Sequence, residues 1–139
     1  MSIEQLVYIS RSSQPLTSPL DVADILEQAS RNNPFLDLTG VLTWRGDTFV
    51  QLLEGPPEAL DVMMARLLFD PRHSDIDILS RETVSERTFP EWALVFPMFT
   101  PRTGADLTKM LQQERRALPV WRKVLQRMAR EQARALAKR

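Results

Sequence analysis

Cysteine is absent from this chain of 139 residues, and histidine and tyrosine each occur once. Without thiols the protein forms no disulfide framework, no thiolate metal site and no cysteine nucleophile, and it fits a reducing compartment. The lone histidine, His73, follows a proline in an expected loop and has too few partners for a metal site or a Ser-His-Asp triad. Walker and GxGxxG loops are missing too. These absences argue against hydrolytic or phosphoryl-transfer chemistry, and we expect neither a metal nor an enzyme.

Long apolar runs are missing as well. No run approaches the ~20 residues of a membrane-spanning helix, and no signal-peptide pattern opens the chain. The 18 basic and 18 acidic side chains cancel, so the overall charge gives no reason to expect a nucleic-acid partner. The length suffices for one domain with a real core. We therefore expect a soluble cytoplasmic protein that binds neither membranes nor nucleic acid.

The apolar pattern predicts an α+β fold. Period-two alternation indicates strands, and i, i+3, i+4 spacing indicates helices. The expected strands cover residues 3–10, 37–44, 48–54, 75–85 and 92–96, and the expected helices cover 18–33, 55–70, 105–118 and 119 onward. Two helices that each connect two strands predict a ferredoxin-like βαββαββ sheet with both helices on one face, followed by C-terminal helices. In that topology the first and third strands are central neighbours.

Gln51 fits this pattern least well. It shares one face of the third strand with Phe49 and Leu53, the face that should be buried. A buried amide left unpaired costs about 1–3 kcal/mol, and it needs partners for both its oxygen and its NH2 group. Backbone groups could satisfy it, or it could be placed to read the edge of a ligand. The expected neighbour of Gln51 across the central strand pair is Tyr8, and tyrosines in strands usually pack with the hydroxyl bonded to backbone.

Two further features each have a structural and a functional interpretation. Asn32 and Asn33 end the first predicted helix before Pro34, where asparagines are good caps, but their amides could also face a ligand at the helix end. Residues 120–139 carry seven basic side chains against one acid, Glu131. Such a helix can bind nucleic acid or anionic membrane, but docking on the domain or on a second subunit is the more common role and the one we favour.

Five short motifs, taken together and in order, resemble the BLUF family of blue-light sensors that use flavin. They are LVYIS at 6–10, the Asn32-Asn33 pair ahead of Leu38-Thr39-Gly40, GDTFVQLLEG at 46–55, ARLLFDPRH at 65–73 and RTFPEW at 87–92. Each motif alone is weak evidence, whereas five with matching spacing are highly specific. The resemblance covers residues 3–98, and we expect a flavin-binding domain at 1–98 with a C-terminal helical extension at 99–139.

The resemblance also implies which residues hold the flavin. The ring would lie between the two helices that cover the sheet, with Ile25 and Leu67 on its faces and the amides of Asn32 and Asn33 at its polar edge. The remaining matches lie near the family's ribityl and phosphate chain, and they are Arg66, Asp70, Arg72 and His73. The expected cofactor is FAD, with FMN and riboflavin left open by the sequence.

The family's photoactive tyrosine and glutamine match Tyr8 and Gln51. The resemblance implies that light drives an electron and a proton from Tyr8 and that Gln51 then rearranges its hydrogen bonds. A carboxamide has a donor end and an acceptor end, so it can bridge the phenol and the flavin edge in more than one pattern. A stronger hydrogen bond to the flavin carbonyl would shift absorption to longer wavelength. No covalent adduct is needed, which fits a chain without cysteine.

The last strand departs from the family pattern. The family commonly has tryptophan, one residue, then methionine, whereas here Trp92 is followed by Ala93 and Leu94. Leucine keeps the approximate volume of methionine but lacks its sulfur, a weak hydrogen-bond acceptor. We expect the flavin to bind and the absorption shift to form. We expect Leu94 to affect the coupling of Gln51 to the last strand and the rate of dark recovery.

Three hypotheses follow for the function. The first is a photoreceptor without substrate turnover, whose output is contact with a downstream protein or with further copies of the chain, as a dimer or a larger oligomer. The alternative is a flavin-dependent oxidoreductase on the same fold, but the nicotinamide-binding signature that it would need is missing. The third is a ferredoxin-like scaffold that no longer binds flavin, and the presence of Tyr8, Gln51 and both asparagines argues against it.

Overall fold

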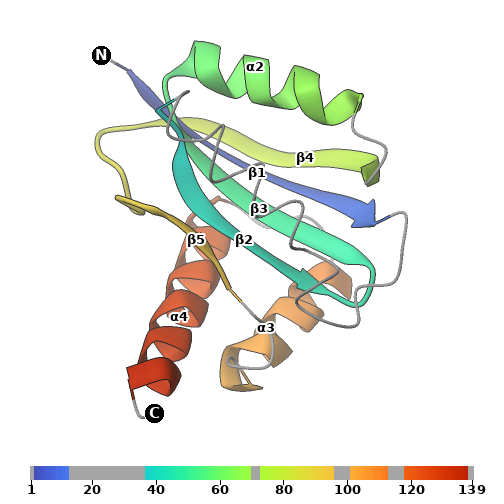
Figure 1. Cartoon of the computed structure of the whole chain (residues 1–139), viewed down its shortest axis with the longest axis vertical. Coiled ribbons are helices and arrows are strands. Elements are labelled where there is room, and N and C mark those ends of the chain that lie inside the picture. The colour runs from blue at the N-terminus through green and yellow to red at the C-terminus, as the bar shows by residue number, and fades with distance from the viewer. Residues whose placement is uncertain (1, 13–36, 70–72, 96–100, 113–117, 138–139) are drawn as a thin grey trace.

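The computed structural model describes residues 2–12, 37–69, 73–95, 101–112 and 118–137 (Figure 1). Its strands are β1 (Ile3–Ser12), β2 (Thr39–Arg45), β3 (Thr48–Gly55), β4 (His73–Val84) and β5 (Trp92–Leu94), and its helices are α2 (Pro57–Leu68), α3 (Pro101–Gln112) and α4 (Leu118–Ala137). The strands form one sheet in the order β4-β1-β3-β2-β5, antiparallel except for the β2–β5 pair. This order confirms the predicted ferredoxin-like α+β fold with β1 and β3 at its centre. The helix predicted over 18–33 lies outside the described residues.

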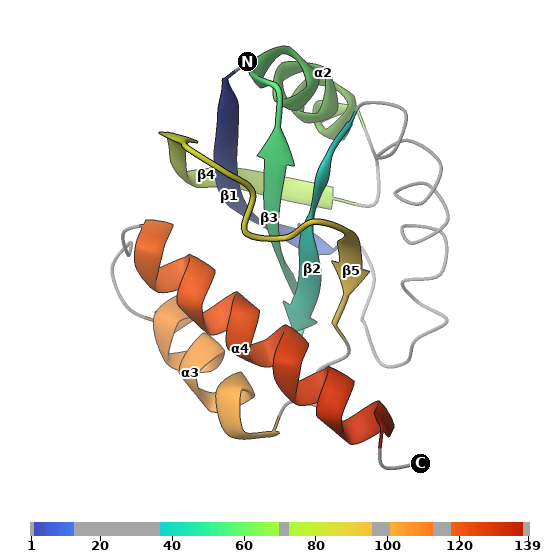
Figure 2. The same ribbon diagram turned by 90° about the vertical axis from the view of Figure 1, so that its left-hand side faces the viewer.

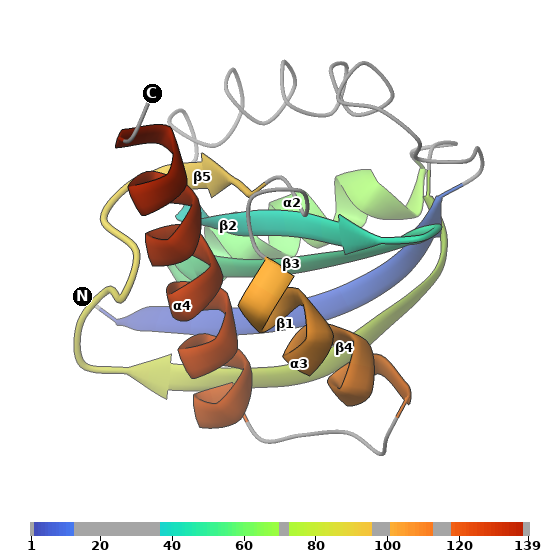
Figure 3. The same ribbon diagram turned by 90° about the horizontal axis from the view of Figure 1, so that it is seen from below.

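Helices cover both faces of the sheet. α2 lies on one face, and α3 and α4 lie together on the other (Figures 1 and 2), where α4 crosses the strands with α3 beside it (Figure 3). Because strand side chains alternate, β1 directs Leu6 and Tyr8 toward α2 and Val7 toward the C-terminal helices. Trp121 and Leu125 of α4 are buried in the same cluster as Val7. The C-terminal extension therefore shares a hydrophobic core with the sheet.

The predicted hairpin is present as β2 and β3. Arg45 pairs with Thr48, which leaves Gly46 and Asp47 as a two-residue loop. Gly46 has a φ of 58°, and a glycine with positive φ at the first loop position is typical of a type II′ turn. The end of β1 is tied to this loop, because the Ser12 N–H donates to the Asp47 carbonyl at 2.6 Å. The turn thus fixes the register of the two strands that carry Gln51 and its neighbours.

Two predicted boundaries near the edge strand are wrong. β1 continues to Ser12 rather than ending at Ser10, and β4 begins at His73 rather than at Asp75. The cause is long-range, because Ser12 and His73 pair with each other across the two strands. His73 is therefore the first residue of a strand and not part of a loop.

The boundaries of β5 and α3 also differ from the prediction. β5 has three residues instead of five, although the N–H of Val95 still donates to the Leu42 carbonyl at 2.8 Å. α3 begins at Pro101, four residues before the predicted start at Ala105, because proline is well tolerated in the first turn of a helix. The predicted end of that helix, Leu118, is instead the first residue of α4.

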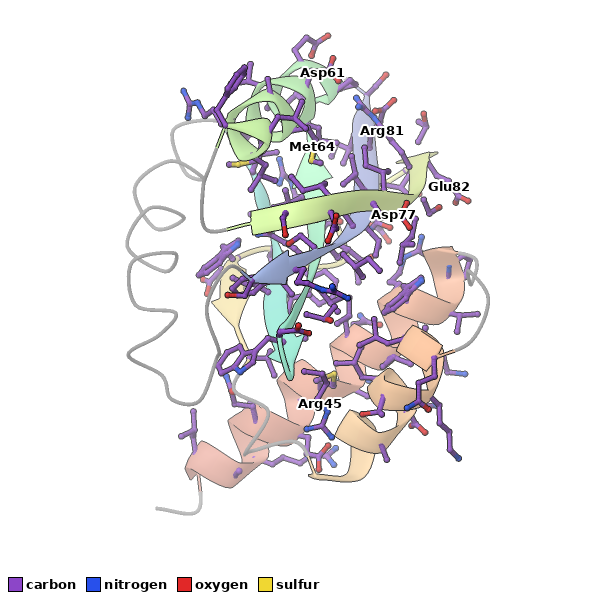
Figure 4. The ribbon with its side chains drawn as sticks, turned by 90° about the vertical axis from the view of Figure 1, so that its right-hand side faces the viewer. Arg45, Asp61, Met64, Asp77, Arg81 and Glu82 are labelled. Carbon is purple, nitrogen blue, oxygen red and sulfur yellow. The ribbon has the colours of Figure 1, made fainter. Side chains whose placement is uncertain are left out.

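Arg81 joins three elements on the α2 side of the sheet. From β4 it donates to Glu4 of β1 at 2.6 Å, to Asp61 of α2 at 2.8 Å and to the Pro57 carbonyl at 3.2 Å. Figure 4 shows Arg81 and Asp61 on the same side of the molecule, with Arg81 on the strand below the helix. The hydrogen bonds to Glu4 and then to Asp61 raise the pKa of Arg81 above its usual value. These contacts tie α2 to the edge of the sheet.

Replacing Arg81 with methionine should reduce the free energy of unfolding by about 1 kcal/mol, the upper range for exposed ion pairs. The loss should be modest because the Arg81 side chain is 31% exposed and its charges are screened by salt. Urea unfolding of both proteins at low and high ionic strength measures it. The difference between variant and wild type should shrink in high salt, and an unchanged difference would show that packing of the methylene stem, not charge, is responsible.

Candidate functional site

Tyr8 and Gln51 lie opposite each other in the centre of the sheet. They are register partners on β1 and β3, and their side chains are 1% and 7% exposed. The Tyr8 hydroxyl donates to Oε1 of Gln51 at 2.5 Å, a short distance for an O–H···O bond. The hydroxyl therefore bonds to a side-chain amide, and the expectation that the two residues sit side by side on one face is confirmed.

Apolar side chains of α2 and the sheet surround this pair. Leu67 of α2 is buried in the same cluster as Tyr8, and Met63, Met64 and Trp92 pack against that cluster. A flat, largely apolar ring would find partners for its faces here. Leu67 thus lies on the side of α2 that faces the sheet, and its contact with a flavin ring stays a prediction.

One buried N–H donor near the pair lacks an acceptor in the part of the chain that the structure describes. The Gln51 oxygen accepts from the Tyr8 hydroxyl. The indole Nε1 of Trp92 is buried and has no hydrogen-bond partner. A buried donor without a partner costs about 1–3 kcal/mol, so the Trp92 indole calls for an acceptor. Apolar walls with an unpaired indole N–H suit a heteroaromatic ring that carries carbonyl and ring-nitrogen acceptors at one edge, as flavin does.

The backbone register places Leu94 in the same cross-sheet row as the pair. Tyr8 pairs with Gln51, Gln51 with Leu42, and Leu42 with Leu94. Trp92 lies opposite Gly40, two rows away along the strands. The last strand therefore reaches the level of Gln51 with one strand between them.

The other residues predicted from the resemblance are only partly covered by the structure. Arg66 is exposed on α2, and His73 is placed through its backbone at the start of β4. The rest lie outside the described residues, and they are Ile25, Asn32, Asn33, Asp70 and Arg72. The structure thus brings together Tyr8, Gln51, Leu67 and Trp92, and the remaining ligand positions stay predictions.

A family model settles what kind of domain carries this arrangement. The model of BLUF, described as sensors of blue-light using FAD, matches residues 3–95. The chain belongs to the BLUF family. It is therefore a flavin-binding, blue-light sensing domain over that range, and its family confirms the resemblance inferred from the five motifs.

The relatives of this BLUF domain include much longer proteins. The photoactivated adenylate cyclase subunit beta of Euglena longa is 37% identical over 94 residues, which are 67% of this chain and 11% of that protein. A bacterial light-regulated adenylyl cyclase structure has a TM-score of 0.70 at 31% identity and covers 79% of this chain and 34% of its own. The chain thus spans about a tenth of the curated relative's length.

A shorter structural neighbour matches nearly end to end. BlrB, described as a BLUF protein in its dark state, has a TM-score of 0.76 at 28% identity and covers 88% of this chain and 94% of its own. The fold similarity therefore extends past the residues matched by the family model into the C-terminal extension.

Two other kinds of feature are absent from the described part of the chain. Among the described residues, no group of three His, Cys, Asp or Glu side chains could hold a metal ion. Nor is any described helix both long and apolar enough to cross a membrane.

One buried polar cluster, Gln5 with Glu54, was not predicted from the sequence. Gln5 and Glu54 are both 0% exposed and pair with each other across β1 and β3. Each is a polar residue on an otherwise apolar strand face, Gln5 beside Val7 and Glu54 beside Leu52. That is the same signal that singled out Gln51, and applied to these two positions it would have found them.

Proposed function

We propose that this BLUF domain is a blue-light photoreceptor that binds FAD non-covalently and forms its signalling state through Tyr8 and Gln51. The hydrogen bond from the Tyr8 hydroxyl to Gln51 Oε1 carries the proposal. The Trp92 indole N–H, unpaired among the described residues, and the apolar cluster with Leu67 support a flavin edge and a flavin face at this point. Ile25, Asn32 and Asn33 complete the proposed ring site, and Arg66, Asp70, Arg72 and His73 line the phosphate chain.

The chain's residues have distinct roles in this proposal. Bound flavin supplies the blue-light absorption and an excited state that is a strong oxidant. Tyr8 is the donor of an electron and of the proton on its hydroxyl oxygen, and both return to it when the charges recombine. Gln51 changes its hydrogen bonds meanwhile, because its amide can present either a donor or an acceptor to the phenol. Trp92 and Leu94 modulate the new arrangement from β5.

The output is proposed to be a protein contact through the C-terminal extension at 99–139. A groove of about 590 Å³ lies between α3 and α4 and is lined by the apolar Met110, Val120 and Val124. Lys109, Lys123 and Arg127 surround it. A groove of this kind suits a downstream protein or a second copy of the chain. The same proposal has four further parts. The extension is a separate unit from the flavin-binding domain at 1–98, and the chain forms a homo-oligomer. It turns over no substrate and is located in the cytoplasm.

Replacing Gln51 with leucine tests the role of the amide. Leucine keeps the buried volume approximately but has neither a donor nor an acceptor for the phenol and the flavin edge. We expect the purified variant to retain flavin, because Leu67 and the other apolar side chains of the α2-side cluster remain in place, and to lose the reversible shift to longer wavelength. Light-minus-dark absorption spectra measure both properties. A variant that holds flavin and still shifts as the wild type does would remove Gln51 from the mechanism.

A further inference from the structure

A second polar pair crosses the same two strands as Tyr8 and Gln51. Gln5 of β1 and Glu54 of β3 are register partners, three positions along each strand from the photoactive pair. An odd offset places them on the opposite face of the sheet, the face covered by α3 and α4 (Figure 3). The two strands therefore carry one polar pair toward the flavin side and one toward the C-terminal helices.

Glu54 is held by three donors although it is completely buried. Gln5 Nε2 donates to Oε2 at 2.6 Å, the Thr88 N–H donates to Oε2 at 2.9 Å, and the Phe89 N–H donates to Oε1. Gln5 Nε2 also lies 2.9 Å from the Thr88 hydroxyl. A carboxylate can only accept hydrogen bonds, and bonds to a charged acceptor are stronger than neutral ones. The carboxylate thus joins β1, β3 and the segment before β5.

Arg122 connects this cluster to α4. Its Nε donates to Oε1 of Gln5 at 2.9 Å, across 117 positions of the chain. Both ends of the Gln5 amide are therefore used, one toward Glu54 and the other toward α4. The result is an unbroken run of hydrogen bonds from β3 through β1 to the helix.

We propose that Gln5, Glu54 and Arg122 form a link that couples the Tyr8–Gln51 pair to α4, so that light weakens the Arg122–Gln5 contact and loosens the helix from the sheet. The inference rests on the proposed photoreceptor function. When the Gln51 amide rearranges, β1 and β3 shift relative to each other, because that amide bridges them. Hydrogen bonds depend steeply on distance and direction, whereas apolar packing accommodates small displacements. The hydrogen bonds of the Gln5–Glu54–Arg122 link, which starts from the same two strands, therefore weaken before the apolar contacts do.

Hydrogen–deuterium exchange of the whole flavin-loaded protein, in the dark and under continuous blue light, measures the loosening. Backbone amides of α4 in the wild type should exchange about fivefold faster or more in light, the low end of the fold-changes that coupling between two sites produces. In Arg122→Met the same amides should already exchange in the dark at the lit wild-type rate, with no further change in light. The absorption shift should persist in this variant, because Tyr8 and Gln51 lie on the other face.

Two variants test whether the effect belongs to the link. Gln5→Met removes its middle member and should give the same light-independent exchange as Arg122→Met. Arg130→Met removes an equal charge from the same helix, at an exposed position that does not line the groove, and should keep the wild-type difference. Since Arg122 is half-buried at the edge of the cluster, we expect its variant to fold.

The possible outcomes are distinguishable. A wild-type shift in absorption without faster exchange in α4, or an Arg122→Met variant with a full light-dependent difference, overturns the coupling and leaves the photoreceptor proposal standing. A lower stability of Arg122→Met with that difference intact would assign Arg122 a purely structural role. A wild type with no reversible absorption shift would overturn both proposals.

Discussion

Replacing Tyr8 with phenylalanine should abolish the light-induced absorption shift and leave the flavin bound. Tyr8 is the single tyrosine of the chain, and its hydroxyl is the group that donates to Gln51 Oε1. Phenylalanine keeps the ring that packs with Leu6 and Leu53 in the α2-side cluster, so the fold and the pocket should survive. It removes the oxidisable phenol and the proton that moves. Absorption spectra before and after blue light, with the flavin content of the purified protein, measure the result.

The same variant separates the photoreceptor from the alternative flavin-dependent oxidoreductase. An oxidoreductase would accept electrons from a reduced nicotinamide cofactor whether or not Tyr8 keeps its hydroxyl. The control is Gln5→Met, which changes the hydrogen-bonded link on the opposite face of the sheet. It leaves the Tyr8 phenol intact and should retain the absorption shift. If Tyr8→Phe still shifts reversibly at the wild-type amplitude, the phenol is not the donor and the mechanism proposed here is wrong.

Replacing Gly40 with alanine should have the largest effect on stability. Gly40 has a φ of 148°, and a Cβ added there would lie 1.9 Å from the backbone oxygen of Leu52 and 2.9 Å from its carbonyl carbon. Backbone atoms of a central strand cannot move aside as a flexible side chain can, and Gly40 pairs with Leu53 and Trp92 on its two sides. We expect a loss of more than about 4 kcal/mol in the free energy of unfolding, or failure to fold.

Gly46→Ala is the matched control for this substitution. Gly46 lies in the turn of the same hairpin with a φ of 58°, and nothing lies within 4 Å of an added Cβ. The free energy of unfolding of this variant should fall by only about 1–2 kcal/mol, the backbone cost of placing alanine at a positive φ. Urea unfolding of both variants gives the comparison. Equal losses for Gly40→Ala and Gly46→Ala would mean that β2 and β3 can separate at Gly40, against the described register.

The central strand pairing could be predicted because its causes are local. Alternation along 3–10 and 48–54 assigns side chains to faces, and the glycine turn fixes the register of β3 against β2. The βαββαββ order then makes β1 and β3 neighbours, which brings Tyr8 beside Gln51. These steps need only short segments and a topology rule. The juxtaposition of Tyr8 and Gln51 was accordingly predicted although the two residues are 43 positions apart.

The rest of the site depends on contacts that no local pattern determines. His73 was predicted to lie in a loop because it follows a proline, but its partner Ser12 lies at the far end of another strand. The link from Arg122 to Gln5 requires knowing how α4 crosses the sheet, and an arginine on a basic helix is normally a surface residue. Gln5 and Glu54 did carry a signal, as polar residues on apolar faces. Their contacts with Thr88, Phe89 and Arg122 could be found only once the segment before β5 and the helix α4 were placed.

The most direct test of the account is an absorption spectrum of the purified protein, recorded in the dark, after blue light and during dark recovery. The account predicts a flavin spectrum that moves to longer wavelength in light and returns in the dark through many cycles, without a change in flavin content. Bound flavin that only bleaches or becomes reduced, with no reversible shift, would contradict the claim that Tyr8 and Gln51 form the signalling state.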